Sequence, residues 1–227
     1  MQRRSYLRAV GATGASLGLA GCVGGLASLG DPNPNVTLSE PDRQYESADV
    51  PYPAWGQRVP DVTLPAATTD ASVSFPDLSR PTFVTFFYST CMTVCPLVVS
   101  ELAAIQDRAI ETDYADRVTF APITFDPQRD TPETLATYAE EMNVDLTAGN
   151  WRFLRPESRE RAQAVVGEEF GLTFERTQPD DMDQYMFTHG ALVLLVNADG
   201  YVERAYRDRR PPREQMASDL ETVLGVA

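Results

Sequence analysis

Lysine is absent from this 227-residue chain, histidine occurs once, and cysteine occurs three times. All 19 basic residues are therefore arginine, and they stand against 33 acidic residues, for a formal net charge of −14. This charge disfavours nucleic acid as a partner, because phosphate backbones are bound by clustered Lys and Arg. Acidic, lysine-free surfaces resemble those of halophilic proteins, in which high salt screens the repulsion between like charges.

The N-terminus also lacks an apolar run long enough to cross a membrane, which takes about 20 residues as a helix. Its uncharged stretch, Ala9 to Gly21, follows a twin-arginine pattern at Arg3-Arg4 and ends in Leu19-Ala20-Gly21-Cys22, which resembles a lipobox. This order of features predicts a twin-arginine lipoprotein signal peptide over residues 1–22, with Cys22 as the lipid attachment point. The expected location is then the extracytoplasmic face of the cell membrane. The alternative is a Gly/Ala-rich N-terminus with an incidental cysteine.

Three cysteines leave one thiol unpaired, and an unpaired thiol outside the cell is prone to unwanted disulfide formation. If Cys22 carries a lipid, the remaining cysteines form one pair, Cys91 and Cys95. Residues 23–56 are rich in Gly, Pro, Ser, Asn and Asp and show no periodicity. This composition predicts a flexible tether between the lipid and the domain. The folded domain is therefore expected over residues 57–227.

The domain alternates between strand and helix patterns. Strands are expected at 61–64, 72–75, 82–88, 118–125, 191–196 and 201–206, with a further candidate at 151–154. Helices are expected around 98–109, from Pro132 to Met142, over 158–169 and around 216–224. The pattern predicts an α/β protein with a thioredoxin-like fold, in which helices flank a central mixed sheet. The helix after Pro132 is expected as an inserted segment after the second βα unit.

Three local patterns support this assignment. The run from Thr82 to Tyr88 is almost entirely aromatic or β-branched, which is typical of a central strand covered on both faces. Thr131 is a suitable helix N-cap, with Pro132 at the first helical position. The segment Asn197-Ala198-Asp199-Gly200 predicts a hairpin turn between the last two strands.

The main chemical signal is the segment from Tyr88 to Pro96, which contains Cys91 and Cys95 where a strand ends and a helix begins. Free backbone N–H groups and the helix dipole stabilise a thiolate at such a junction. Cysteines four residues apart across this turn approach closely enough for a disulfide or for one metal ion. Two thiolates favour soft Cu(I) or borderline Zn(II).

The single histidine, His189, directly precedes the strand expected at 191–196. In the predicted fold this strand runs beside the one that leads to Cys91 and Cys95, so a loop at that end of the sheet faces the thiols. Two thiolates and one imidazole form a three-ligand site for either oxidation state of copper. A lone histidine without this placement is more often a surface or core residue.

Three segments together resemble the Sco/SenC family, across most of residues 57–227. They are Cys-x-x-x-Cys-Pro at 91–96, the run Asp126 to Glu133, and His189 before a strand–Asp-Gly–strand hairpin. The resemblance implies a membrane-attached, extracytoplasmic protein that binds copper through Cys91, Cys95 and His189. It also implies assistance in assembling the copper centre of cytochrome c oxidase subunit II, and some members are thought to reduce that subunit's cysteines.

The chain departs from the family pattern beside its expected ligands. Met92-Thr93 stands where members commonly have Pro-Asp, and Thr188 and Gly190 replace an Asp and a Ser or Thr around the histidine. None of these is a primary ligand, but groups behind a metal site tune it. Met92 is expected to pack, with a weak thioether contact to the metal as the alternative.

Three other residues have structural interpretations. Asp126 and Asp130 are expected to build the turn and helix start after Phe125, since two like charges alone make a poor metal cluster. Trp151 is expected in the core.

Two other function classes compete with a copper chaperone. A thiol–disulfide oxidoreductase or thiol peroxidase would use Cys91 and Cys95 as its catalytic residues, although the motif has one residue more than the usual redox motif. A peroxidase also needs a nearby Arg or Thr, and Arg129 is a candidate that the spacing does not require. In the third class the Cys91–Cys95 pair is a structural disulfide that binds no metal.

Overall fold

The computed structural model describes residues 33–180 and 183–226. Its strands are β1 (Thr63–Pro65), β2 (Ser72–Ser74), β3 (Thr82–Phe87), β4 (Thr119–Thr124), β5 (Phe174–Thr177), β6 (Met186–His189), β7 (Val193–Val196) and β8 (Val202–Tyr206). Its helices are α1 (Val94–Glu111), α2 (Pro132–Glu141), α3 (Arg159–Ala162) and α4 (Arg213–Leu224). α3 continues into a π-helix at Gln163–Glu169, and short 3₁₀ turns occur at Ser47–Asp49, Phe75–Asp77, Ala115–Arg117 and Leu146–Ala148.

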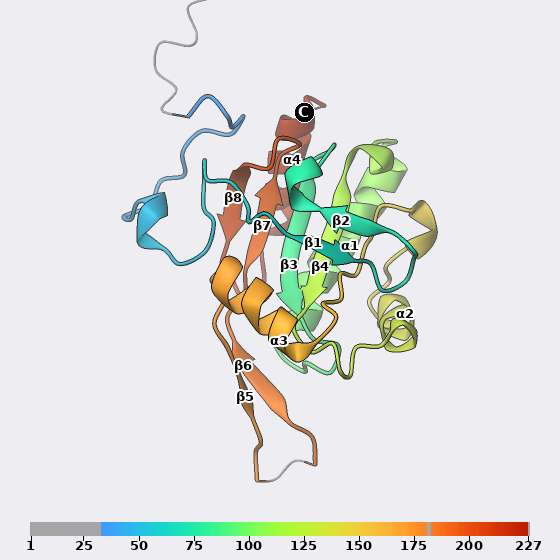
Figure 1. Cartoon of the computed structure of the whole chain (residues 1–227). Coiled ribbons are helices and arrows are strands. Elements are labelled where there is room, and N and C mark those ends of the chain that lie inside the picture. Colours follow the sequence, from blue (N-terminus) through green and yellow to red (C-terminus); the bar gives the residue numbers. More distant parts are fainter. Residues whose placement is uncertain (1–32, 181–182, 227) are drawn as a thin grey trace, which may run out of the picture. The chain divides into compact units, whose positions relative to one another are not determined.

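A four-stranded mixed sheet in the order β4-β3-β7-β8 forms the centre of the domain (Figure 1). β3 runs parallel to β4, with Thr82 opposite Thr119, and antiparallel to β7, with Thr82 opposite Val196. α1 and α4 pack together behind this sheet in the view of Figure 1, and α3 crosses its front. The predicted α/β, thioredoxin-like architecture is confirmed, and so is the additional helix α2 after β4.

β3 is the central strand of the fold, and it is buried on both faces. All six of its residues are buried. Phe83 stacks on Phe120 of β4 at 5.8 Å between ring centroids, and Phe120 stacks on Trp151 at 5.2 Å. Burial of each large apolar side chain contributes about 1.5–3 kcal/mol, so this aromatic column supplies much of the core. Trp151 is 1% exposed, as expected of a core residue.

The ends of the helices follow the predicted capping residues. The Thr131 hydroxyl accepts a hydrogen bond from the Thr134 N–H at 3.2 Å, and Ser158 caps α3 in the same way through Arg161. The strand considered at 151–154 does not form. Trp151 makes an isolated bridge to Phe120, and Leu154 makes isolated bridges to Ile123 and Ala66.

The segment 33–56, which we call the N-terminal strap, corrects the expectation of a flexible tether. The expectation covered residues 23–56, of which 23–32 lie outside the described residues. Within the strap, Val36, Leu38, Tyr52, Ala54 and Trp55 are buried. A flexible chain would leave these side chains in water, so the tether prediction is wrong for this part.

The strap is held by a buried glutamate, Glu203, on the edge strand β8. The Glu203 carboxylate is fully buried and accepts hydrogen bonds from the N–H groups of Thr37 and Leu38 at 2.8–3.0 Å. Gly171 has a φ of +67°, and a Cβ there would lie 1.7 Å from the Pro51 carbonyl oxygen, so this close approach to the strap requires glycine.

A second sheet, formed only by β5 and β6, was not predicted. Phe174 pairs with His189 and Thr177 with Met186, and the hairpin extends beyond the end of the main sheet (Figure 1). His189 is thus the last residue of a strand and not part of a loop. Among the described residues, no helix combines the length and the apolar character needed to span a bilayer.

An ion-pair cluster around one buried carboxylate joins α1 to the segment that begins α4. The Glu101 side chain is 4% exposed and contacts Arg210 and Arg213, each at 2.5 Å. Burial alone would raise the pKa of Glu101, but the hydrogen bonds from the two guanidinium groups outweigh burial and hold this pKa below its ordinary value.

Glu101→Gln is expected to lower the free energy of unfolding at pH 7 by about 1–3 kcal/mol, because it removes two charge-assisted hydrogen bonds. Since the folded-state pKa is depressed, this stabilisation is complete above the ordinary value of about 4.3 and is lost as the pH falls through the folded-state pKa. Urea unfolding at pH 7 and at about pH 3 should show the difference from wild type closing in acid. The exposed Glu140→Gln is the control, and an unchanged difference at both pH values would contradict the ion-pair explanation.

Candidate metal centre

The two cysteines lie where β3 ends and α1 begins. Cys91 is in the connecting loop, where its N–H donates to the Tyr88 carbonyl at 3.2 Å, and Cys95 is the second residue of α1. Both are free thiols, with 4% and 1% of their surface exposed. Strand β3 and the start of α1 therefore fix the two sulfur atoms at the carboxyl end of the sheet.

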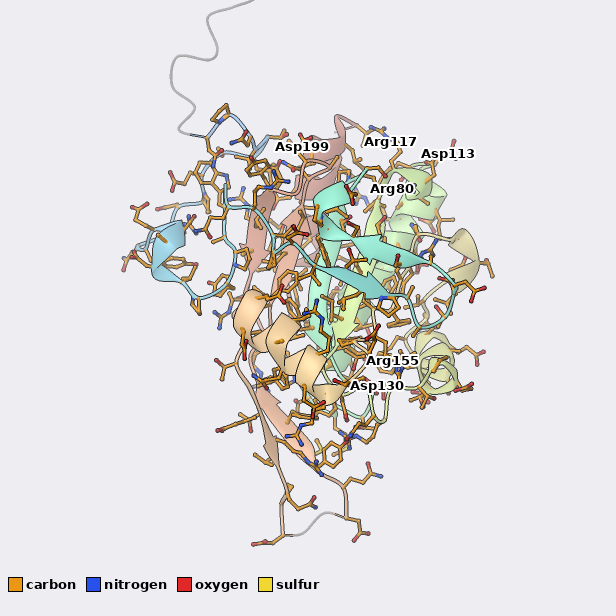
Figure 2. All side chains as sticks on the ribbon, viewed as in Figure 1. Arg80, Asp113, Arg117, Asp130, Arg155 and Asp199 are labelled. Carbon is orange, nitrogen blue, oxygen red and sulfur yellow. The ribbon has the colours of Figure 1, made fainter. Side chains whose placement is uncertain are left out.

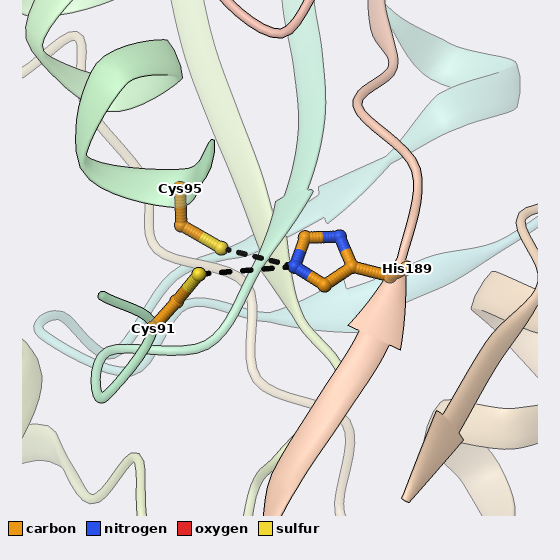
Figure 3. A group of neighbouring side chains, drawn as sticks. All are labelled: Cys91, Cys95 and His189. Carbon is orange, nitrogen blue, oxygen red and sulfur yellow. Dashed lines mark hydrogen bonds between the residues drawn. The ribbon is translucent and has the colours of Figure 1, made fainter. Parts of the chain in front are cut away.

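His189 approaches the cysteines from β6 (Figure 3). Its Nε2 lies 3.4 Å from the Cys95 Sγ and 3.9 Å from the Cys91 Sγ. The three potential ligand atoms all lie within 4.8 Å of one another. Among the described residues, these three side chains are the cluster of His, Cys, Asp or Glu residues that could hold a metal ion. The structure thus brings together the three ligands expected from the sequence.

The orientation of the imidazole is set by its other nitrogen. Nδ1 lies 2.9 Å from the Gly190 carbonyl oxygen, which can only accept a hydrogen bond, so Nδ1 carries a proton. Nε2 is therefore the nitrogen that faces the sulfurs, and in the neutral ring its lone pair is free for a metal ion. The ring is also packed edge-on against Phe125, at 5.0 Å between centroids, and against Tyr88, at 5.8 Å.

The two thiols differ in acidity. The pKa of Cys91 is lowered, above all by the hydrogen bond from the Cys95 thiol and, against the opposing effect of burial, by contacts with His189 and Thr93. Burial raises the pKa of Cys95, and the nearby Cys91 sulfur adds to this effect. Cys91 is therefore the more acidic thiol of the pair and the first to supply a thiolate, either as a nucleophile or as an anchor for a soft cation.

Asp130 is hydrogen-bonded to Ser89 in the loop that leads to Cys91. The sequence did not predict this contact. Its buried carboxylate accepts hydrogen bonds from the Ser89 N–H at 3.2 Å, from the Ser89 hydroxyl and from the Thr124 hydroxyl. Burial raises the pKa of Asp130, and these hydrogen bonds oppose the rise. Arg155 donates to the Asp130 carbonyl at 3.0 Å, and both residues lie at the same end of the sheet (Figure 2).

Asp126 forms the expected turn, since its carbonyl accepts from the N–H groups of Arg129 and Asp130. Its carboxylate also accepts from the Tyr185 hydroxyl at 2.9 Å and from Arg129 Nε. The side chains of Asp126 and Asp130 thus connect the loop after β4 to Tyr185 beside β6 and to Ser89 in the cysteine loop. A short alternation of Tyr185, Phe187 and His189 is the sequence signal that would have revealed β6 and this contact.

Met92 does not pack as expected. Its side chain is 68% exposed beside Cys91, so the prediction of a packed methionine is wrong. The neighbouring Thr93 hydroxyl lies 3.5 Å from the Cys91 sulfur and contributes to lowering its pKa. The lipid attachment predicted at Cys22, together with the signal peptide at 1–22, lies outside the described residues.

A comparison with family models decides the classification. The model described as SCO1/SenC matches residues 68–225, which include the cysteine loop and His189. The chain belongs to the SCO1/SenC family. This agrees with the resemblance seen in its three sequence motifs.

A curated protein of similar sequence supports the same assignment. A SCO2-like protein of Rickettsia prowazekii is 27% identical over 127 residues, a stretch that is 54% of this chain and 57% of the relative. The chain thus matches little more than half the length of this curated relative.

Two solved structures share the fold. ScoI of Bradyrhizobium japonicum, solved with copper bound, is 26% identical, with a TM-score of 0.57 over 70% of this chain and 94% of the other. A SCO1/SenC family lipoprotein of Bacillus anthracis gives a TM-score of 0.61 at 22% identity, over 75% and 96% of the two chains.

Proposed function

We propose that this SCO1/SenC chain binds one copper ion through Cys91, Cys95 and His189 and delivers it to the copper centre of cytochrome c oxidase, with subunit II as acceptor. The observation that carries the proposal is the convergence of two sulfurs and Nε2 within 4.8 Å, with the imidazole already oriented by Gly190. The copper-bound ScoI relative supports the choice of metal.

The donor set accounts for binding of both copper oxidation states as cargo. Two thiolates suit soft Cu(I), and the imidazole adds the nitrogen donor that Cu(II) prefers. Zinc also accepts thiolate and imidazole, but structural zinc sites take four protein ligands. Purified, reduced, metal-free protein should therefore take up one equivalent of copper, and an equimolar supply of zinc should not displace it. A protein that binds no copper when reduced would refute the proposal.

The asymmetry of the two thiols supports a second activity, thiol–disulfide exchange. The Cys91 thiolate would attack a disulfide of a partner protein, forming a mixed disulfide and releasing one partner thiol. Cys95 would then lose its proton and attack Cys91, which releases the second partner thiol and leaves a Cys91–Cys95 disulfide. The partner is reduced by two electrons and this chain is oxidised by two. Such a reaction would prepare acceptor cysteines for the metal.

We further propose that Cys22 carries a lipid and holds the protein at the extracytoplasmic face of the cell membrane, after export by the twin-arginine route. Support comes from the order of the Arg3-Arg4 pair, the uncharged stretch and the lipobox-like segment.

Cys22→Ser is expected to release the protein from the membrane fraction or to block removal of residues 1–21. One lipid chain alone binds a membrane weakly, so a second chain on the same residue is expected for stable attachment. Cell fractionation and intact-mass analysis would measure both effects, with the Cys91→Ser/Cys95→Ser double variant as the control that stays membrane-bound. An unmodified, uncut N-terminus in the wild-type protein would refute the anchor.

A further inference from the structure

The position of His189 depends on a hairpin that is separate from the main sheet. β5 and β6 form a two-stranded sheet of their own, whereas Cys91 lies in the connection between β3 and α1 and Cys95 in the first turn of α1. The distance between the imidazole and the thiols is therefore set by whatever fixes the hairpin to the body of the domain. A two-stranded hairpin without such support is only marginally stable in water.

Arg129, in the loop after β4, makes a polar connection to the hairpin, in addition to the aromatic contacts of Phe125 with Phe174 and Phe187. Its Nη1 donates a hydrogen bond to the carbonyl oxygen of Tyr185 at 2.9 Å, one residue before β6 begins. Its guanidinium carbon also lies 3.7 Å from the centre of the Tyr185 ring and 5.7 Å from that of Tyr88. Arg129 of the main domain thus contacts both the backbone and the ring of Tyr185, the residue next to β6.

Asp126 adds a second contact from the main domain to Tyr185, and Arg176 adds a contact from within the hairpin, which does not tie the hairpin to the domain. Asp126 accepts hydrogen bonds from the Tyr185 hydroxyl and from Arg129 Nε, so the carboxylate orients the arginine and the tyrosine together. Arg176 of β5 lies 3.7 Å from the same ring. Because two guanidinium groups cannot occupy one face at that distance, Tyr185 is sandwiched between Arg129 of the body and Arg176 of the hairpin.

Tyr185 is coupled to His189 through strand geometry. Side chains two residues apart lie on the same face of a strand, so Tyr185, Phe187 and His189 form one row. Phe187 packs against Tyr185 at 5.6 Å between ring centroids, and its N–H donates to the Tyr88 hydroxyl at 3.4 Å. A displacement of Tyr185 therefore shifts the row that ends in the imidazole.

We propose that Arg129 is a positioning residue that sets His189 against Cys91 and Cys95 through Tyr185. This deepens the proposed copper function, because Cu(II) needs the imidazole while two thiolates suffice for Cu(I). The planar guanidinium is required, since it donates in its plane and stacks with its face at the same time, which a lysine ammonium does not do. Arg129 thereby controls which oxidation state of copper the site holds well.

The single histidine allows a direct test in the metal-free, reduced protein. Arg129→Gln is expected to shift or split the one set of imidazole signals in nitrogen-15 NMR spectra. It is also expected to lower Cu(II) affinity about 10- to 100-fold, the usual effect of losing a group that orients a ligand. Cu(I) affinity should change less than about threefold, because both thiolates remain.

Arg176→Gln is the matched control, because Arg176 stacks on Tyr185 at the same distance but belongs to the hairpin itself. It should leave the imidazole signals and the Cu(II) affinity close to wild type. Adding Arg129→Gln to His189→Ala should cost no further Cu(II) affinity, since a residue that acts through His189 has nothing left to position. Should Arg129→Gln fail to fold, Tyr185→Leu removes the contacted ring and is expected to reproduce the NMR shift.

The inference is overturned if Arg129→Gln and Arg176→Gln behave alike, or if the effects of Arg129→Gln and His189→Ala on Cu(II) affinity add. Unchanged imidazole signals in both Arg129→Gln and Tyr185→Leu would overturn it as well. A wild-type protein that binds no copper would instead refute the proposed function. The imidazole signals of the metal-free variants would then still decide whether Arg129 positions His189.

Discussion

Oxidation of Cys91 and Cys95 to a disulfide is expected to abolish tight copper binding. The oxidised sulfurs are no longer thiolates, so two of the three ligands are lost and only the His189 imidazole remains. The expected loss is about a thousandfold or more in affinity, since each lost ligand costs a few kcal/mol and every 1.4 kcal/mol is a factor of ten. Equilibrium titration of oxidised and reduced protein against a copper chelator of known affinity would measure it.

Two controls separate this loss from unfolding or damage. Treatment of the oxidised protein with a thiol reductant should restore full copper binding. The Cys91→Ser/Cys95→Ser variant should bind as weakly as the oxidised protein and should not respond to the reductant. Equal copper loading of oxidised and reduced wild-type protein would mean that the metal site lies elsewhere in the chain.

His189→Ala is expected to lower Cu(II) affinity about 100-fold, which corresponds to about 2.7 kcal/mol, and to affect Cu(I) much less. The reason is that the imidazole is the nitrogen donor of the site, whereas the two thiolates are sufficient for Cu(I). The thiolate-to-copper charge-transfer absorption should weaken or shift, and oxidase assembly should fail in cells that carry the variant. Absorption spectroscopy and oxidase activity of membranes provide the two measurements.

Thr188→Ala is the matched control for this variant, because Thr188 is the neighbouring residue on β6 and its side chain is exposed. It should bind both copper states as wild type does. If His189→Ala protein bound both states normally but exchanged disulfides slowly, the histidine would serve to tune the thiols. Thiol–disulfide exchange would then replace copper delivery as the main function.

The sequence was sufficient for the parts of the fold that rest on local patterns. The apolar run that became β3, the capping residue Thr131 and the turn at 197–200 each act within a few residues. The metal-centre residues Cys91, Cys95 and His189 followed from their places at the ends of predicted elements. In each case short-range chemistry and the global fold agree, which is typical of natural sequences.

The parts that were missed depend on contacts between distant residues. Glu203 lies more than 160 positions from Thr37, and no local pattern shows that a buried carboxylate there will order the N-terminal strap. The β5–β6 hairpin has short strands and a long connection in place of a two-residue turn, so it lacks the usual hairpin signal. Ser89 and Asp130 likewise meet only because β3 and β4 are neighbours.

The N-terminal strap would also limit the distance between the domain and a membrane if Cys22 carries the proposed lipid. It begins near the turn after β7, where the Asn197 amide donates to the Asn35 carbonyl at 2.9 Å, and β3 points its cysteine end away from that turn. If Cys22 carries the lipid, only residues 23–32 separate the bilayer from the docked strap. A fully extended linker over residues 23–32 is at most about 35 Å long, whereas an extended linker over residues 23–56 would reach about 120 Å. If the proposed lipid is present, the strap would attach the linker near the turn after β7, so Cys91, Cys95 and His189 would lie at the end of the domain farther from that attachment point.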